Sequence, residues 1–187
     1  MVEIKNLTFG YSSPIFENFS FSFPKSGIIA LSGPSGSGKT TLLKLISGII
    51  PSKCISVSGK SALLFQDNRL LPWFTISENL SILSSKSNVL PYLALVGLED
   101  AAKLYPENLS GGMARRVCFA ATVAFEPDVL LLDEPTSNLD AENAEKIRAI
   151  IKNFAKNKLV IMSTHSPEDL ALADKIIYSE DFKNERN

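Results

Sequence analysis

Apolar and polar residues alternate in two stretches near the start of the chain, residues 2–5 and 19–23, as in half-buried antiparallel strands. Short and almost continuously apolar runs follow at residues 28–32, 61–65, 129–133, 159–163 and 175–178. Continuous apolar character is typical of strands that are covered on both faces, as in a parallel sheet. Because helical stretches separate these runs, the sequence predicts an α/β fold with a mainly parallel central sheet and antiparallel strands at the N-terminus.

The alternation of strands and helices is interrupted between residues 67 and 109, a stretch rich in Leu, Ser and Asn. Thr75 followed by Glu78 has the spacing of a capping box and predicts the start of a helix. We interpret residues 67–109 as a small helical subdomain, inserted into a core of residues 1–66 and 110–187 within a single domain that spans 1–187. Residues 70–74 (Leu-Leu-Pro-Trp-Phe) suit a partner helix, although ordinary packing within the subdomain explains them equally well.

Composition and charge narrow the class of protein. The chain has 187 residues, 45% of them hydrophobic, which is enough to bury a core. With Lys+Arg 19 and Asp+Glu 20, the net charge of −1 gives no reason to expect nucleic acid as a partner. The first residues lack the layout of a signal peptide, and no apolar run approaches the roughly 18 residues of a membrane span, so we expect a soluble, cytosolic chain. Cys54 and Cys118 lack metal-ligand spacing, and we expect two reduced, mostly buried thiols.

A phosphate-loop pattern, G-x-x-x-x-G-K-[ST], lies between the apolar run at 28–32 and a stretch with helical spacing that reaches Ile46. Its members are Gly33, Pro34, Ser35, Gly36, Ser37, Gly38, Lys39 and Thr40. Glycines let backbone N–H groups approach phosphate oxygens, and the following helix points its positive end at the anion. Lys39 would reach the β- and γ-phosphates, and the Thr40 hydroxyl would help to hold Mg²⁺. The pattern predicts binding of a nucleoside triphosphate; a Gly/Ser-rich turn that matches by chance is the alternative.

Two carboxylates, Asp133 and Glu134, follow the apolar run at 129–133 directly. In open α/β sheets ligands bind at the carboxyl ends of the strands. Asp133 would hold Mg²⁺ through water, and Glu134 is placed to polarise the water that attacks a γ-phosphate. An apolar strand that only enters a solvated turn would look the same in isolation, but the phosphate loop in the same chain favours the functional interpretation.

A third pattern, Leu109-Ser110-Gly111-Gly112, precedes a predicted helix that reaches about Phe125 and offers exposed N–H groups as a second anion site. Phosphate loop, Leu-Ser-Gly-Gly and Leu-Leu-Leu-Asp-Glu-Pro occur in the order of the ATP-binding cassette (ABC) ATPases, which the chain resembles over nearly its whole length. The resemblance implies a P-loop NTPase core that binds ATP and Mg²⁺. It also implies that two cassettes pair head to tail, so that Ser110, Gly111 and Gly112 of one contact the γ-phosphate held by the other. The alternative is a Gly-Gly turn that merely caps a helix.

The same resemblance implies roles for further residues, most of which also have a plainer explanation. Tyr11 would stack on adenine, although a lone Tyr is more often a surface or core residue. Gln66 would touch Mg²⁺ and the attacking water, although a Gln at a strand end is usually a solvated turn residue. Asp140 would lie in a loop that communicates across the dimer and would cap the next helix. His165 would contact the γ-phosphate rather than serve a structural role, and Thr41 would join the ATP-binding residues.

Some positions depart from the family pattern. Glutamines are usual at the positions of Met113 and Arg115, and an Arg-Ala pair is usual at the positions of Ala121 and Thr122. Glu134 and His165 are intact, so we expect hydrolysis. The chain continues only a short way past Tyr178, and we expect no control through a C-terminal regulatory extension.

These residues predict the ATPase subunit of an ABC transporter, cytoplasmic and peripheral at the inner face of the cell membrane. Its partners would be a second cassette, identical or related, and integral membrane permease subunits bound through the helical subdomain. Residues 65–73 look like those of importer ATPases for nitrate, sulfonate and taurine-type substrates. The alternatives are a non-transport ABC ATPase, either of iron–sulfur cluster assembly or linked to nucleic acid, and a P-loop kinase. A nucleic-acid-linked ATPase would show a long heptad insertion or two cassettes, and a kinase would need an acceptor site in place of Leu-Ser-Gly-Gly.

Overall fold

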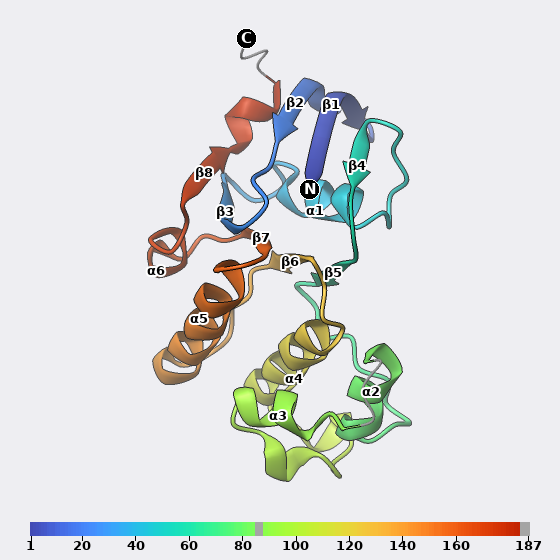
Figure 1. Ribbon diagram of the computed structural model, residues 1–187, viewed down its shortest axis with the longest axis vertical. Coiled ribbons are helices and arrows are strands. Elements are labelled where there is room, and N and C mark those ends of the chain that lie inside the picture. The colour runs from blue at the N-terminus through green and yellow to red at the C-terminus, as the bar shows by residue number, and fades with distance from the viewer. Residues whose placement is uncertain (85–87, 184–187) are drawn as a thin grey trace.

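A five-stranded parallel sheet forms the centre of the molecule, in the strand order β5-β6-β7-β3-β8 (Figure 1). The computed structural model describes residues 1–84 and 88–183. The strands are β3 (Gly27–Ser32), β5 (Ser61–Leu64), β6 (Val129–Asp133), β7 (Leu159–Ser163) and β8 (Lys175–Tyr178). They are the five strands predicted from the apolar runs, with ends that agree within one residue.

Both faces of this sheet are covered, which explains why its strands are almost continuously apolar. In β6, Leu130 and Leu132 belong to the hydrophobic cluster on one side, whereas Val129 and Leu131 belong to the cluster on the other. In β7, Val160 and Met162 belong to the first cluster, whereas Leu159 and Ile161 belong to the second. Successive side chains of a strand point to opposite faces, so a sheet with two covered faces needs apolar residues at every position.

One face is covered by helix α1 (Lys39–Ile46) and a three-stranded antiparallel sheet in the order β2-β1-β4. The predicted N-terminal strands are present but longer, as β1 (Val2–Gly10) and β2 (Pro14–Ser22). Their register shifts, and Asn6 and Asn18 have positive φ of 50° and 52°, so the regular alternation that marks a strand is lost. Strand β4 (Ile55–Val57) was not predicted, because three residues are too few to show a pattern.

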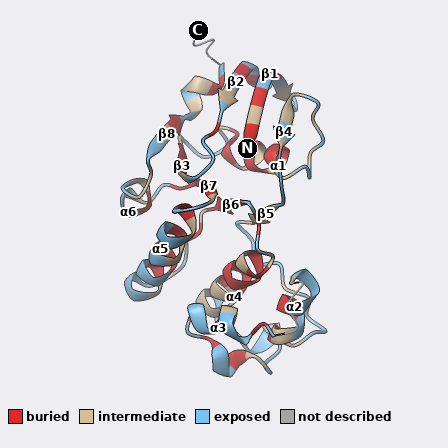
Figure 2. Cartoon of the chain, viewed as in Figure 1, coloured by how far each residue is buried: buried red, intermediate tan, exposed pale blue. Residues whose placement is uncertain are grey.

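The other face packs against helices α4 (Gly111–Ala124) and α5 (Ala141–Ala155), and the cluster there includes α2 (Ile76–Leu83) and α3 (Leu90–Leu95). Two 3-10 turns, Glu99–Ala101 and Pro106–Asn108, connect α3 to α4, and the chain ends with α6 (Pro167–Leu170), β8 and a turn at Ser179–Lys183. Figure 2 shows that α4 carries much more buried surface than α2 or α3. The division into a core and a subdomain of residues 67–109 stays a prediction.

The predicted helix starts are confirmed by their caps. Thr75 and Glu78 form the capping box of α2: Thr75 Oγ1 accepts from Glu78 N, and Glu78 Oε2 accepts from Thr75 N at 2.7 Å. Ser110 and Asp140 cap their helices as predicted, by accepting a backbone N–H with the side chain, and Ser166 caps α6 in the same way. Among residues 1–84 and 88–183, none of the helices combines the length and apolar character that crossing a membrane requires.

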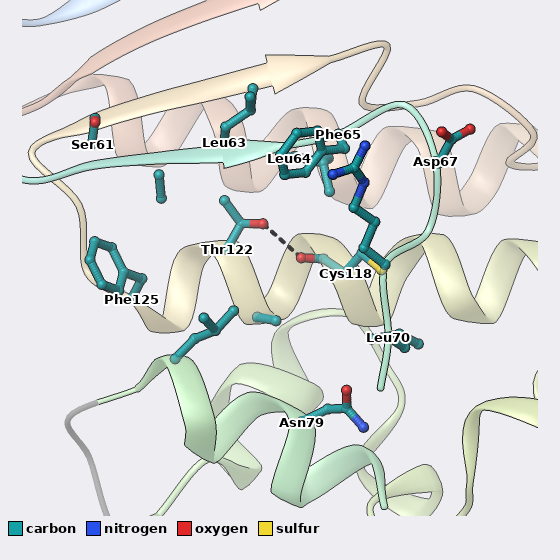
Figure 3. A pocket seen from close by; sticks show the side chains of 14 residues that line it. Ser61, Leu63, Leu64, Phe65, Asp67, Leu70, Asn79, Cys118, Thr122 and Phe125 are labelled. Atoms are coloured by element: carbon teal, nitrogen blue, oxygen red, sulfur yellow. Dashed lines mark hydrogen bonds between the residues drawn. The ribbon is translucent and has the colours of Figure 1, made fainter. Parts of the chain in front are cut away.

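An apolar pocket of 290 Å³ opens between the edge strand β5 and helices α2 and α4 (Figure 3). Small side chains on α4 leave this space, among them Cys118, Ala121 and Thr122. The Thr122 hydroxyl donates to the Cys118 carbonyl at 2.8 Å, so its polar group is satisfied. Cys54 and Cys118 are free thiols as predicted, the first partly buried and the second buried, and burial raises the pKa of Cys118.

Candidate active site

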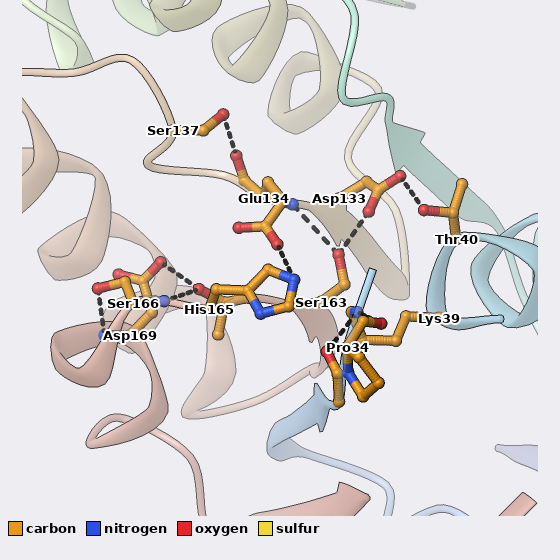
Figure 4. Close-up of polar contacts among 12 residues, drawn as sticks. Pro34, Lys39, Thr40, Asp133, Glu134, Ser137, Ser163, His165, Ser166 and Asp169 are labelled. Carbon is orange, nitrogen blue, oxygen red and sulfur yellow. Dashed lines mark hydrogen bonds and ion pairs between the residues drawn. The ribbon is translucent and has the colours of Figure 1, made fainter. Parts of the chain in front are cut away.

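Three segments meet at the carboxyl edge of the parallel sheet: the loop after β3, the end of β6 and the loop after β7 (Figure 4). They come together because β6, β7 and β3 are neighbours in the sheet and run in the same direction. The loop after β3 carries the phosphate-loop pattern, the end of β6 carries Asp133 and Glu134, and the loop after β7 carries His165. Residues that are more than 90 positions apart thus share one site, as shown by the hydrogen bond from Thr40 to Asp133.

The phosphate loop curves around a cavity of 120 Å³ that residues 36–41 line, Thr41 included. Gly38 is the N-cap of α1 with φ of 101°, and a Cβ atom there would overlap the side chain of Ile15. Gly36 also has a positive φ, 77°, with open space on its side-chain side. Glycine alone adopts these conformations at little cost and leaves backbone N–H groups accessible to an anion. Within the described chain, the Ser37 hydroxyl is buried without a hydrogen-bond partner, which makes it a further donor for such an anion.

Lys39 folds back over its own loop. Its ammonium group donates to the carbonyl oxygens of Gly33 and Pro34 at 2.8 and 2.9 Å. Burial lowers the pKa of Lys39, while the negative charges of Glu134 and Asp133 act in the opposite direction. The cation is therefore held by neutral acceptors that a phosphate oxygen can replace.

Asp133 is buried at the end of β6 and accepts two hydroxyl hydrogen bonds. Thr40 Oγ1 donates to its Oδ2 at 2.8 Å, and Ser163 Oγ donates to its Oδ1 at 2.5 Å. The carboxylate thereby joins the phosphate loop to β7. Ser163 was missed as a functional residue in the sequence, although it is the only polar residue of the apolar run Leu159–Ser163 and ends that strand.

Glu134 has a left-handed backbone conformation with φ of 51°, and its N–H donates to the Ser163 carbonyl at 3.1 Å. Its Oε1 lies 3.6 Å from Nε2 of His165. Burial raises the pKa of Glu134, and the opposing effect of His165 is the largest of those that lower it. A carboxyl group with a raised pKa, close to the cation of Lys39, is a candidate general base.

The remaining predicted residues lie outside this cluster, on the surface. Tyr11 is exposed between β1 and β2 with its ring edge-on to Phe9, and Gln66 is exposed after β5. Ser110 caps α4, and Asp140 caps α5 by accepting from Asn143 N at 2.8 Å. In the part of the chain that the structure describes, no hydrogen bond or ion pair joins these four side chains to the phosphate loop. Gly111 and Gly112 are also accessible, and no atom lies within 4 Å of a Cβ added at Gly111.

Two buried charged residues, Asp169 and Arg115, form hydrogen bonds with the segments that carry the site, and neither was assigned a role from the sequence. Asp169 accepts hydrogen bonds from Thr136, which lies two residues after Glu134, and from Thr164, which directly precedes His165. Arg115, noted in the sequence only as a departure from a pattern, donates to backbone carbonyls at the ends of β5 and β6. Isolated Arg and Asp residues in amphipathic helices carry no sequence signal that distinguishes them from surface charges.

Comparison with known proteins gives concordant matches. Residues 16–137 match the family model described as ABC transporter. The "Aliphatic sulfonates import ATP-binding protein SsuB" of Bacillus cereus is 35% identical, over 87% of this chain and 72% of the relative. The protein of the same name from Delftia acidovorans is 35% identical, over 92% of this chain and 76% of the relative.

Solved structures agree over the whole chain. A dimeric post-hydrolysis structure of the ATP-binding cassette MJ0796 bound to ADP and Pi has a TM-score of 0.89 and 27% sequence identity, over 100% of this chain and 97% of that chain. A second dimeric structure of MJ0796, described as a bacterial ABC transporter cassette, matches with the same TM-score, 0.89. These likenesses confirm the predicted α/β fold class.

Proposed function

The chain belongs to the ABC transporter family, as its motifs predicted, and we propose that it hydrolyses ATP at the carboxyl edge of its parallel sheet to drive a transporter. The observation that carries this proposal is the convergence of three separate segments, which bring Lys39, the pair Asp133 and Glu134, and His165 to one place. A cation, a buried carboxylate of the kind that holds a metal ion and a partly buried carboxylate that can act as a base are the groups that transfer of a γ-phosphoryl group to water requires.

ATP would bind with its phosphates in the loop of residues 33–40. The accessible N–H groups of the loop and the start of α1 would bind phosphate oxygens, and Lys39 would exchange the carbonyls of Gly33 and Pro34 for the β- and γ-phosphates. The Thr41 side chain lines the same cavity. Tyr11, exposed on a turn between two strands, is free to stack on the adenine ring.

Mg²⁺ fits the oxygen pair formed by Thr40 and Asp133. Hydroxyl and carboxylate oxygens are the hard donors that this ion prefers, and here Thr40 Oγ1 and Asp133 Oδ2 lie 2.8 Å apart beside the phosphate loop. Held by these residues together with ATP, Mg²⁺ would supply positive charge that stabilises the negative charge developing during phosphoryl transfer. Thr40 would bind it directly, Asp133 through water, and Gln66 through its exposed side-chain amide.

Glu134 would polarise the attacking water, because its carboxylate lies beside the loop and burial raises its pKa toward the range of an effective base. His165 would hold that carboxylate through Nε2 and reach the γ-phosphate. Ser163 orients the Asp133 carboxylate, to which its hydroxyl donates, and fixes the backbone of Glu134, whose N–H donates to the Ser163 carbonyl.

A second cassette would complete the site. Ser110, Gly111 and Gly112 present the N-terminus of the 14-residue helix α4 at the surface, where it can bind the γ-phosphate held by a partner. Asp140, exposed at the start of α5, would contribute to the same interface. Both compared structures of MJ0796 are described as dimeric, which supports this arrangement. Either a copy of this chain or a related cassette would serve as the partner.

A helix of a membrane-spanning permease would bind at the apolar pocket, where the helical subdomain of residues 67–109 meets β5 and α4, and at the loop of residues 70–74 beside it. Trp73 is 80% exposed on this loop. The loop is held by the buried Asn79, which accepts from Leu71 N at 2.7 Å and donates to the carbonyls of Leu71, Phe74 and Thr75. A large aromatic side chain on an already ordered loop binds a partner with little loss of conformational entropy.

The relatives are named for import of aliphatic sulfonates, and we extend that substrate class and direction to this transporter. Other chains would recognise the substrate. On this proposal the protein works at the cytoplasmic face of the cell membrane. The relatives favour a transport ATPase over iron–sulfur assembly or a nucleic-acid-linked role.

ATP hydrolysis by the purified chain tests the site. Glu134→Gln should lower kcat by about 10²–10⁴-fold, the usual contribution of a general base, while ATP affinity stays unchanged because the phosphate contacts remain. Glu17→Gln, an exposed carboxylate in β2, is the matched control and should keep wild-type turnover. Wild-type kcat in Glu134→Gln would disprove the role of this residue.

Copurification tests the transport role. A tagged chain from detergent-solubilised membranes of its native cell should retain a polytopic permease, and Trp73→Ala should lose it while keeping ATP binding. Recovery of only soluble, ribosomal or DNA-bound partners would contradict a transport function.

A further inference from the structure

Arg115 lies in the second turn of α4, and only 2% of it is exposed. One terminal nitrogen, Nη1, donates to the carbonyl oxygens of Phe65 and Gln66. The other, Nη2, donates to the carbonyl oxygens of Asp133 and Glu134 at 2.5 and 2.7 Å. A single guanidinium group therefore binds both the segment that carries Gln66 and the segment that carries Glu134.

These carbonyls need such a donor because the two strands part at this point. Pairing between β5 and β6 ends with Leu64 opposite Leu132. Beyond that pair, no β5–β6 ladder bond reaches these carbonyls, and the hydrogen bonds that Arg115 donates to them are buried or partly buried. The planar, multi-donor fork of Arg can bridge two parallel chains, which a methylene chain or a single ammonium group cannot. Arg115 thus replaces the ladder and sets the spacing between the two segments.

Stability alone does not account for this residue. A buried cation is costly, and an apolar side chain of similar volume is often at least as stabilising as a buried charge. Burial lowers the pKa of Arg115. Nearby charges, including those of Asp133 and Glu134, act in the opposite direction but do not cancel this effect. Its Nε is also buried and, among the described residues, lacks a hydrogen-bond partner, which adds a further cost. The guanidinium group performs a task that an apolar residue would not.

We propose that Arg115 is a positioning residue that couples the start of α4 to Gln66 and Glu134. This inference rests on the proposed function, in which Ser110 at the same helix start meets the γ-phosphate held by the partner cassette. Ser110 and Arg115 are separated by about 7.5 Å along the axis of one continuous helix, at about 1.5 Å per residue. A displacement of α4 on dimer closure therefore moves the backbone on which the two water-handling side chains sit. Hydrolysis is favoured only when the partner is in place.

Kinetics separates coupling from ATP binding. Arg115→Met should lower kcat by about a hundredfold, as expected for a displacement of about 1 Å of the reacting groups, while the ATP dissociation constant changes by less than about twofold. Arg116→Met is the matched control, because Arg116 is the next residue of α4 and its Nη1 donates to the Val96 carbonyl rather than to the segments of Gln66 and Glu134. It should retain wild-type kcat. Arg115→Lys, with one ammonium group, should recover part of the lost rate.

Fluorescence tests the coupling directly, because Trp73 is the only tryptophan of the chain and lies in the segment that follows Gln66. ATP should change Trp73 emission in Glu134→Gln and in Glu134→Gln/Arg116→Met. It should not do so in Glu134→Gln/Arg115→Met, although that variant still binds ATP. An equal response in the Arg115→Met variant, or no response in any variant, would overturn the proposal.

These outcomes separate the coupling role of Arg115 from the proposed ATP hydrolysis on which it rests. If the wild-type protein does not hydrolyse ATP, both fall. If it does, and Arg115→Met has the same kcat, only the coupling role of Arg115 falls. Should Arg115→Met fail to fold by circular dichroism, Arg115→Lys decides, and wild-type kcat and Trp73 response in that variant would refute the requirement for a two-sided fork.

Discussion

Replacing Asp169 by alanine would remove the carboxylate that joins the loops after β6 and β7. Only 1% of Asp169 is exposed. Its carboxylate accepts from Thr136 Oγ1 at 2.7 Å, from Thr164 Oγ1 at 3.1 Å and from Arg148 Nε at 2.7 Å. The variant leaves a largely buried guanidinium group and two buried hydroxyls without their acceptor.

Breaking a buried ion pair by deleting one partner costs about 3–5 kcal/mol. At about 2–4 °C per kcal/mol for a chain of this size, Tm should fall by about 6–20 °C. The chain supplies an internal control, because Arg148 also pairs with Glu145 at 3.3 Å, and that carboxylate is 74% exposed. Glu145→Ala should cost less than about 1 kcal/mol, since solvent screens an exposed pair.

Urea unfolding without nucleotide measures both changes, compared at equal m-values. The cost of Asp169→Ala should be smaller in an Arg148→Met background, where no guanidinium group is left unpaired. If Asp169→Ala and Glu145→Ala prove equally destabilising, burial does not decide the strength of these pairs and the reasoning fails.

Two further predictions concern catalysis. Turnover requires the ionised Glu134 carboxylate, so activity is present above its raised pKa and is lost as pH falls through it. His165→Gln removes the imidazole whose positive charge and hydrogen bonding oppose this rise, so the acid limb of the kcat–pH profile should move to higher pH. A limb at lower pH would contradict the pairing. If Ser110 acts in trans, mixing an inactive Ser110→Ala chain with an inactive Lys39→Ala chain should restore one composite site in each mixed dimer. No recovery in ATPase assays, despite mixing proven by native mass spectrometry, would count against it.

Much of the fold and the core of the site could be predicted from the sequence. The five strands of the parallel sheet carry short, almost continuously apolar runs, because both faces of the sheet are covered and most of its side chains are buried. The phosphate loop, the capping box at Thr75 and the carboxylates after β6 depend on neighbouring residues, so their patterns are readable in a linear chain. Strand β4 and the irregular pairing near Asn6 escaped prediction, because a three-residue strand and a bulge leave no periodic signal.

Only the tertiary structure decided which distant groups meet. The strand order β6-β7-β3 places Ser163 between the phosphate loop and Asp133, and the parting of β5 from β6 creates the row of carbonyls that Arg115 binds. Asp169 is identifiable as a link between two loops only after α5 and α6 are packed against the sheet. Short-range patterns reflect the conformational preferences of adjacent residues, whereas these contacts depend on how strands far apart in the sequence are ordered, and no local pattern encodes that order.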